Sequence, residues 1–388
     1  MEFGFDKGPH LKDTNHTSKI MRRLFIALIP IILFAIYKNG FLPYSEGTID
    51  LYGALRPLLM IILAVITSLL VETIYLGLIL KKDDLIRNLK ESYAIFPGLF
   101  MVLLLPVNTP LWVVILGSAV ATLFGKMIFG GFGYNIFNPA LVGVLFVLTF
   151  FSSIIISRGG YLNAIELNTI ASPLSNLSNI NYVGTYDELM TPFGTIWDML
   201  FGFIPGGLGE TSKILIILAF FYLIFTKVIK WIIPVSCILV VFVMTYIIGF
   251  MNDINIWYPL FHILSGGLLF GSVFMATDPV TSPTTKFGQL LFGLGLGLLT
   301  VINRFILPFP AAIVIAILMM NMLVFIIDTI GAKAKFKLSY KYLSLSLFAI
   351  AIIGFSIYLG NGFRNDNLVE ANSITNLSIV CKTNVNLL

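Results

Sequence analysis

Long, uninterrupted apolar runs constrain this chain more than any other feature of its sequence. Among its 388 residues, 58% are hydrophobic and 11% are charged, whereas a soluble domain carries about 25% charged residues. A helix needs about 20 apolar residues to cross a bilayer, and we predict an all-α polytopic integral membrane protein with about 10–11 transmembrane helices. The predicted spans are residues 22–39, 55–79, 92–106, 110–127, 139–157, 213–229, 232–250, 259–276, 287–304, 308–329 and 342–360.

The same composition excludes several classes of protein. So few charges cannot cover a soluble globule of this size, which excludes a cytosolic enzyme, a disordered chain and a nucleic-acid-binding protein. The only cysteines, Cys237 and Cys381, are too few for a disulfide scaffold, an iron–sulfur cluster or a Cys-rich zinc site within this chain. We therefore expect a lipid bilayer as the surroundings, and no metal site and no catalytic side chain in this chain by itself.

The basic residues predict how the chain is oriented. With the N-terminus in the cytoplasm, 17 of the 24 Lys and Arg residues fall on the cytoplasmic side and 7 on the other, as the positive-inside rule requires. We divide the chain into a cytoplasmic N-terminal segment (1–21), a membrane domain (22–329) and an additional C-terminal helix with a polar tail (330–388). A long polar loop, 158–212, then lies outside the cytoplasm.

Two acidic residues lie within or at the end of predicted spans. Glu72 belongs to the second span and Asp328 closes the tenth. Intramembrane acids are costly and often mark an ion pathway, so the pair could attract a cation that enters from the cytoplasm. The alternative is that Glu72 is a hydrogen-bonded helix contact and Asp328 an interfacial residue.

Two short polar segments interrupt the apolar pattern. Residues 129–143 read FGGFGYNIFNPALVG and contain Asn138-Pro139, and residues 274–288 read FMATDPVTSPTTKFG and contain Thr277-Asp278-Pro279. Such sequences stop helices and leave backbone groups free. Each segment therefore forms either a ligand-binding break or a plain turn. The glycines of GLGLG, 293–297, are interpreted as helix-packing positions.

These segments, together with GFIPGGLGETS and IPVS at 233–236, resemble RnfD, a membrane component of Rnf ion-translocating oxidoreductases. The related NqrB component of sodium-translocating NADH:quinone reductases shares the framework, and the likeness runs from residue 8 to Asp328. It implies a subunit that relays electrons through flavin between ferredoxin- and NADH-linked partners, coupled to Na⁺ or H⁺ translocation, in the cytoplasmic (inner) cell membrane with the other subunits. A non-redox secondary transporter or channel on the same scaffold and a structural subunit remain alternatives.

The resemblance also implies a covalently bound flavin in the long loop. Members of the family carry FMN on a Thr hydroxyl, placed there by a flavin transferase, within a Ser/Thr-Gly-Ala-Thr motif. Here the corresponding stretch runs from Thr169 to Ser172, so Ser172 is the candidate acceptor of the phosphoester. Ile170 stands where the family motif has glycine.

Further site residues follow from the same resemblance. A non-covalent riboflavin or FMN is expected near Asn138, Pro139, Thr277 and Asp278. Ser68 and Leu69 stand where the related NqrB component has paired glycines that are linked to quinone. We therefore do not predict a quinone site.

Glu72 and Asp328 occupy the positions of the acids that the family implicates in cation uptake. The resemblance thus favours the ion-path interpretation of these two carboxylates over the structural one.

Overall fold

The computed structural model describes residues 17–81, 83–160, 174, 182, 184–190, 193–306 and 311–385. Within these ranges the regular secondary structure is entirely helical, which confirms the predicted all-α polytopic membrane architecture. Apolar side chains cover much of the outside of the helices, as expected for a surface that faces lipid.

Seven helical segments in the described ranges are long and apolar enough to cross a membrane. An eighth is bent by 64° at a short break, between α13 (Trp257–Leu264) and the pair α14 (Leu268–Phe270) and η5 (Gly271–Met275). The seven are α1–η1–α2 (Thr17–Ser45), α3–η2 (Leu51–Ile79), α7 (Pro139–Ser157), α12 (Ile232–Met251), α15 (Lys286–Ile306), α16 (Ala312–Phe336) and α17 (Leu338–Val385).

The seven or eight candidate spans of the described residues are fewer than the about 10–11 predicted ones. Every predicted span is largely helical, but three of the helices are short: α5 (Phe96–Leu103), α6–η3 (Leu111–Met127) and α11 (Lys213–Phe225). At 1.5 Å per residue, α5 is about 12 Å long and cannot cross a bilayer. The remaining helices are α4 (Leu85–Ser92), α9 (Tyr186–Met190) and α10 (Ile196–Phe201).

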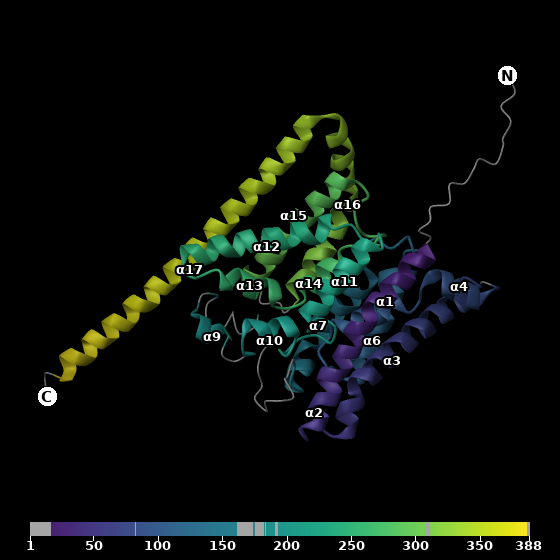
Figure 1. Cartoon of the computed structure of the whole chain (residues 1–388), viewed down its shortest axis with the longest axis horizontal. Helices are drawn as coiled ribbons and strands as arrows, with labels where there is room; N and C mark the ends of the chain where they lie inside the picture. The colour runs from purple at the N-terminus through teal and green to yellow at the C-terminus, as the bar shows by residue number, and fades with distance from the viewer. Residues whose placement is uncertain are drawn as a thin grey trace.

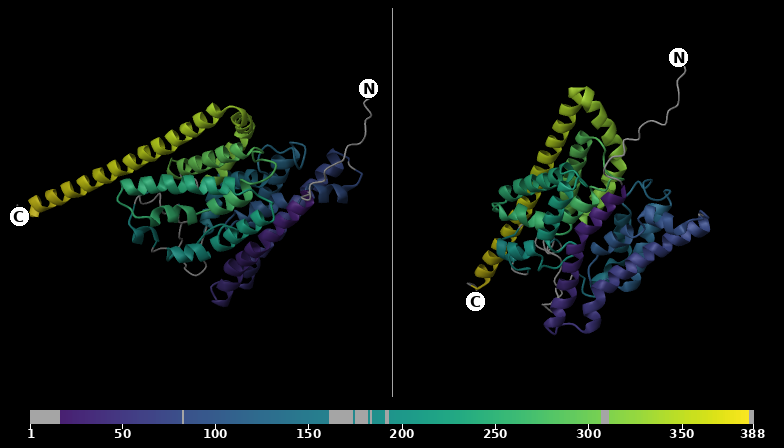
Figure 2. Two further views of the ribbon diagram at one scale, coloured as in Figure 1. Left: turned by 45° about the horizontal axis from the view of Figure 1, so that its top comes forward. Right: turned by 45° about the vertical axis from the view of Figure 1, so that its right-hand side comes forward.

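The helices form two groups that pack side by side. The helices α1 to α7 make one group and α11 to α16 the other, with α1 against α11 and α7 against α16 (Figures 1 and 2). Within the second group α15 packs closely on α12, since a Cβ atom at Gly293 would lie 2.8 Å from Ile233 O and one at Gly297 2.7 Å from Cys237 O. This confirms the helix-packing role of the GLGLG glycines.

Two short helices end inside the protein, so their last carbonyl groups need partners other than water. At the end of α5, Leu103 O and Leu105 O accept hydrogen bonds from Gly209 N (2.6 Å) and Leu208 N (3.0 Å). The GGLGE segment of the long loop therefore reaches into the protein.

The end of α13 is satisfied by side chains instead. Arg304 Nη1 donates to His262 O (2.5 Å) and Arg304 Nη2 to Ser265 O (3.1 Å), while Lys213 Nζ donates to Gly266 O (3.2 Å). Cations at a helix C-terminus also complement the negative end of its dipole.

The C-terminal region consists mostly of one long helix. The single helix α17 runs from Leu338 to Val385, and it extends well beyond the other helices (Figure 1). Its first half contacts α12, α15 and α16. The polar residues that follow the apolar run continue the helix.

Candidate functional site

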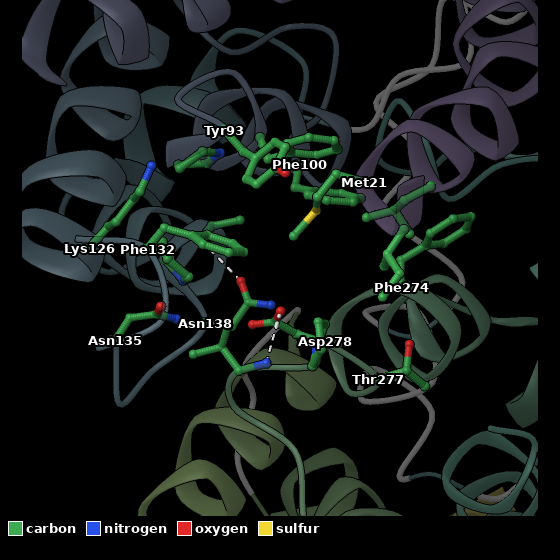
Figure 3. A pocket seen from close by; sticks show the side chains of 18 of the residues that line it. Met21, Tyr93, Phe100, Lys126, Phe132, Asn135, Asn138, Phe274, Thr277 and Asp278 are labelled. Carbon is green, nitrogen blue, oxygen red and sulfur yellow. Dashed lines mark hydrogen bonds between the residues drawn. The ribbon is translucent and has the colours of Figure 1, made fainter. Parts of the chain in front are cut away.

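A cavity of about 70 Å³ lies where the two helix groups meet (Figure 3). Its walls come from α1, α5, η3, η5 and the two polar segments that interrupt the apolar pattern. Its lining is mostly apolar with a few polar groups, a composition that is typical of small-molecule sites. Figure 3 shows aromatic side chains, two amides, a lysine and an aspartate around the space.

Aromatic rings form much of the wall. The rings of Tyr93 and Phe132 lie edge to face with centroids 5.1 Å apart, and those of Phe100 and Phe274 are 6.3 Å apart. Tyr93 has φ +54° and ψ +49°, a left-handed conformation that is an outlier for a bulky residue. Strain of this kind gathers at functional sites, and here it places Tyr93 beside the cavity.

The structure brings the two polar segments together. Asn138 Nδ2 donates to Met275 O (3.3 Å). The buried amide of Asn321 joins the segments again when oriented as its neighbours require, accepting from Asn138 N (3.1 Å) and donating to Thr281 O (3.1 Å). The four residues that were predicted to lie near a non-covalent flavin all line this one pocket: Asn138, Pro139, Thr277 and Asp278.

Glycines shape the first of these segments. Gly130, Gly131 and Gly133 have φ values of +113°, +97° and +94°, which glycine adopts without a steric penalty. The segment then enters α7 at Asn138, whose side chain accepts from Ala140 N (3.1 Å) as the N-cap. The predicted break is thus a turn that also positions pocket side chains.

Asp278 supplies a titratable group to the pocket. It lies in the loop between η5 and α15, where Thr281 Oγ1 donates to its Oδ2 (3.1 Å). Burial raises the pKa of the Asp278 carboxyl to about 6, because desolvation disfavours the charged form more than these hydrogen bonds favour it.

A buried ion pair borders the same pocket. Lys126 Nζ lies 2.7 Å from Glu72 Oε2, and their side chains are 2% and 0% exposed. Lys126 Nζ also donates to Ser92 O (2.6 Å), and its side chain lines the cavity beside Phe132 (Figure 3). The predicted intramembrane acid is therefore neutralised by a lysine that the sequence placed in a cytoplasmic loop.

Hydroxyl groups continue from this pair between α3 and α6. Ser68, one turn before Glu72, shares a hydrogen bond of 2.9 Å with Thr122, which lies one turn before Lys126. Ser118 is one turn further along α6, and its buried Oγ has no hydrogen-bond partner among the described residues. Together these side chains make a narrow polar stripe inside the first helix group.

The second predicted acid, Asp328, has different surroundings. Its carboxylate accepts from the backbone N–H groups of Thr284 (3.0 Å) and Thr285 (3.1 Å) and from both hydroxyls. These contacts fasten the loop before α15 to α16. The structure thus gives Asp328 an anchoring contact, while its part in an ion path stays a prediction.

Three further cations are buried around the inner ends of the short helices. Lys38 donates to Ile204 O, and Lys213 and Arg304 contact the carbonyls at the end of α13. In the prediction of orientation, Lys38, Lys213 and Arg304 were counted, like Lys126, as charges in loops. Since three of the four belong to the smaller, extracytoplasmic group, removing them strengthens the charge bias that predicts the orientation.

The candidate covalent flavin site is not described by the structure. Thr169 and Ser172 both lie outside the described residues, so the FMN attachment stays a prediction.

The lining of the pocket carries groups that match the chemistry of a flavin. Its aromatic walls suit a planar ring, the amides Asn135 and Asn138 and the Asp278 carboxyl offer polar contacts, and Lys126 brings a positive charge. The sequence missed Tyr93, Phe132, Asn135 and Lys126 as lining residues. Only Phe132 and Asn135 carried a signal, since both lie within the 129–143 segment.

The fold and this site define a class: a multi-pass membrane protein with a pocket between two helix groups and a buried ion pair within the first group, at the border of that pocket. Residues 5–337 match the model of the NQR2, RnfD, RnfE family. The chain belongs to this family.

Its relatives are similar over most of their length. The chain is 33% identical over 341 residues to the D component of the proton-translocating ferredoxin:NAD(+) oxidoreductase complex of Clostridium ljungdahlii, covering 86% of this chain and 96% of the relative. It is 30% identical to the Na(+)-translocating counterpart of Acetobacterium woodii, covering 81% and 88%. It is 31% identical to the B component of the Na(+)-translocating NADH-quinone reductase of Chromohalobacter salexigens, covering 84% and 85%.

Proposed function

We propose that this chain is a membrane subunit of an Rnf-type ion-translocating oxidoreductase complex in the cell membrane, and that it relays electrons through flavin between ferredoxin- and NADH-linked partners. The observation that carries the proposal is the aromatic pocket between the helix groups, bordered by the Lys126–Glu72 pair. Family membership supports the assignment to such a complex. Electrons must enter through partner subunits, because two cysteines cannot hold an iron–sulfur cluster.

A flavin bound in the pocket supplies the electron-transfer chemistry, while the protein supplies binding, orientation and electrostatics. Tyr93 and Phe132, which line the pocket, would contact a bound ring and exclude water from it. Asn138 and Asp278 provide hydrogen-bonding groups at the polar segments, and Lys126 provides the positive charge nearby.

A second flavin, FMN, is proposed on Ser172 as a phosphoester made by a flavin transferase. The transported ion is Na⁺ or H⁺, and its path is proposed to pass Glu72 and Asp328. The buried Glu72 carboxylate and the hydroxyl stripe beside it support the first of these two positions.

Riboflavin binding to the purified full chain tests the pocket. Equilibrium dialysis is expected to show one bound riboflavin, with affinity about tenfold weaker in Phe132→Ala because an aromatic contact contributes about 0.5–1.5 kcal/mol. Phe325→Ala, on the exposed face of α16, is the matched control and should bind like the wild type. Equal affinities in both variants would place the flavin elsewhere.

Covalent attachment is tested separately. After co-expression with a flavin transferase, the denatured chain should fluoresce in a gel, and Ser172→Ala should abolish the signal. Peptide mass mapping of residues 159–213 locates the adduct. A chain that holds no flavin in either experiment would favour the non-redox transporter or the structural subunit.

A further inference from the structure

One buried lysine contacts both the intramembrane carboxylate and the ligand pocket. Lys126 Nζ donates to Glu72 Oε2 at 2.7 Å and to Ser92 O at 2.6 Å. An ammonium group has three N–H donors, so two are used by these acceptors. The same side chain lines the cavity, so Lys126 contacts the carboxylate on one side and borders the space of the pocket on the other.

The contact with Lys126 provides a hydrogen-bond partner for only one of the two oxygens of the Glu72 carboxylate. Glu72 is 0% exposed, and its Oε1 atom has no hydrogen-bond partner among the described residues. The hydroxyl oxygens of Ser68 and Thr122 lie on the same stripe, one helical turn from the ion pair. Carboxylate and hydroxyl oxygens are suitable ligands for a hard monovalent cation, and a carboxylate alone suffices for a proton.

We propose that Lys126 is an exchangeable counter-ion of Glu72. Negative charge in the pocket attracts the Lys126 ammonium away from Glu72, and one Na⁺ or H⁺ then takes its place at the Glu72 carboxylate. This inference rests on the proposed function of the pocket. Lys126 then acts as a positioning residue that links the electron path to the ion path.

The charges balance in each state. In the first state Lys126 neutralises Glu72 and the pocket occupant is uncharged. When one electron arrives from a redox centre of a partner subunit, the occupant becomes negative and the ammonium moves towards it. One cation from the aqueous phase then neutralises Glu72, because a buried carboxylate without a partner is strongly unfavourable. No bond to carbon, oxygen or nitrogen forms or breaks when Na⁺ is the cation, and with H⁺ only the O–H bond of Glu72 forms.

Other charges at the pocket do not replace this pair. Among the residues that line the described cavity, Lys126 and Asp278 are the charged ones. Asp278 is acidic and can respond to a negative occupant only by taking up a proton. Lys126 is the group there that brings a positive charge of its own.

Cation binding in the absence of flavin gives the first test. Lys126→Met leaves Glu72 without its counter-ion, so the full chain in lipid nanodiscs should gain one site for radioactive sodium, or one proton seen as a new infrared carboxyl band. The expected gain in affinity over the wild type is about 200- to 5,000-fold, the equivalent of a broken buried ion pair.

Two variants control this measurement. Glu72→Gln/Lys126→Met removes both charges, should fold as well as the wild type and should lose the new site. Lys38→Met also removes a buried lysine, but that lysine contacts the carbonyl of Ile204 and no carboxylate, so no site should appear. The proposal is wrong if Lys126→Met binds cations like the wild type or if the double variant keeps the site.

The redox potential of bound riboflavin gives the second test, which a merely structural ion pair would not affect. Since coupling between two sites is reciprocal, the translocated cation should stabilise reduced riboflavin. The potential should therefore rise with cation concentration, by up to about 59 mV per tenfold for one cation per electron. In Glu72→Gln the riboflavin should still bind while this slope disappears.

The outcomes separate the two proposals. Bound riboflavin whose potential ignores both Na⁺ and pH in the wild type overturns the exchange at Lys126 and leaves the pocket assignment intact. A wild-type chain that binds no riboflavin overturns the pocket assignment, and the exchange falls with it.

Discussion

The protein buries positive charge in two regions and neutralises it in two different ways. Beside the pocket, Lys126 faces the carboxylate of Glu72, a partner that carries charge and can exchange it. In the second region Lys38 donates to Ile204 O, and Lys213 and Arg304 donate to carbonyls at the end of α13, which are fixed dipoles. The buried carboxylate of Glu210 lies near Lys213 and Arg304 but forms no ion pair with them in the described part of the chain. The first region adjoins a cavity, whereas the second holds together the interrupted backbone.

This difference shows how to interpret a buried cation in a membrane protein. A cation on carbonyls satisfies backbone groups that a bilayer cannot hydrate, so its role is explained by the fold alone. A cation on a carboxylate beside a ligand pocket has two possible partners, so the fold alone does not explain it. Four predictions test this contrast.

The largest effect is expected at the ion pair. Glu72→Gln leaves Lys126 buried without a carboxylate and should lower the free energy of unfolding by about 3–5 kcal/mol. Glu72→Gln/Lys126→Met should recover most of that loss. Thermal denaturation in detergent measures both. If the stability losses of Glu72→Gln and Lys126→Met instead add up in the double variant, the two residues are not coupled.

The second effect concerns the carbonyl-bound cations. Arg304→Met leaves His262 O and Ser265 O without donors, so stability should fall by about 2–3 kcal/mol, while riboflavin affinity should stay at the wild-type value. Arg304→Lys keeps one donor, so its stability should lie between those of the wild type and Arg304→Met. If Arg304→Met lost as much riboflavin affinity as Phe132→Ala, the carbonyl-bound cations would also contribute to ligand binding, which contradicts the distinction between the two regions.

The third effect is expected where the two polar segments meet. Asn138→Ala removes the N-cap of α7 and the donor to Met275 O, which should cost about 1–2 kcal/mol and weaken riboflavin binding. Asn138→Asp keeps the capping oxygen and should retain more stability than the alanine variant. Equal thermal stability of the two would argue against the cap.

The smallest effect is a pH dependence at the pocket. Burial raises the pKa of Asp278 to about 6, against about 3.9 in an unfolded chain. Between these values the folded state holds a proton that the unfolded state lacks, so stability should decrease as pH rises from about 4 to about 6. Asp278→Asn should flatten this part of a plot of melting temperature against pH. An unchanged slope would assign the titration to another group.

The sequence identified the parts of the site that carry a local signal. Asn138 and Asp278 stood out because each precedes a proline in an otherwise apolar region, and such steps stop helices. Glu72 stood out because an acid within a span is rare. Lys126 did not, since a single lysine near the end of a span is the ordinary topology signal.

For a related reason, fewer helices of the described residues have the length of a full crossing than the about 10–11 predicted spans. An apolar run shows that a segment is shielded from water, but not that it crosses the bilayer. The α5 region is apolar over its whole length, yet its helix stops at Leu103 because the loop containing Gly209 supplies the hydrogen bonds that end it.

The sequence by itself determined the class of fold, the family and the orientation expected from the basic loops, because these depend on apolar length, motif order and charge count along the chain. Only the tertiary structure decided which groups face one another: that Lys126 neutralises Glu72, that two polar segments 137 residues apart share a pocket, and that three cations bind carbonyl groups. Such pairings arise from the packing of distant helices, where each buried polar group must find a partner in the absence of water.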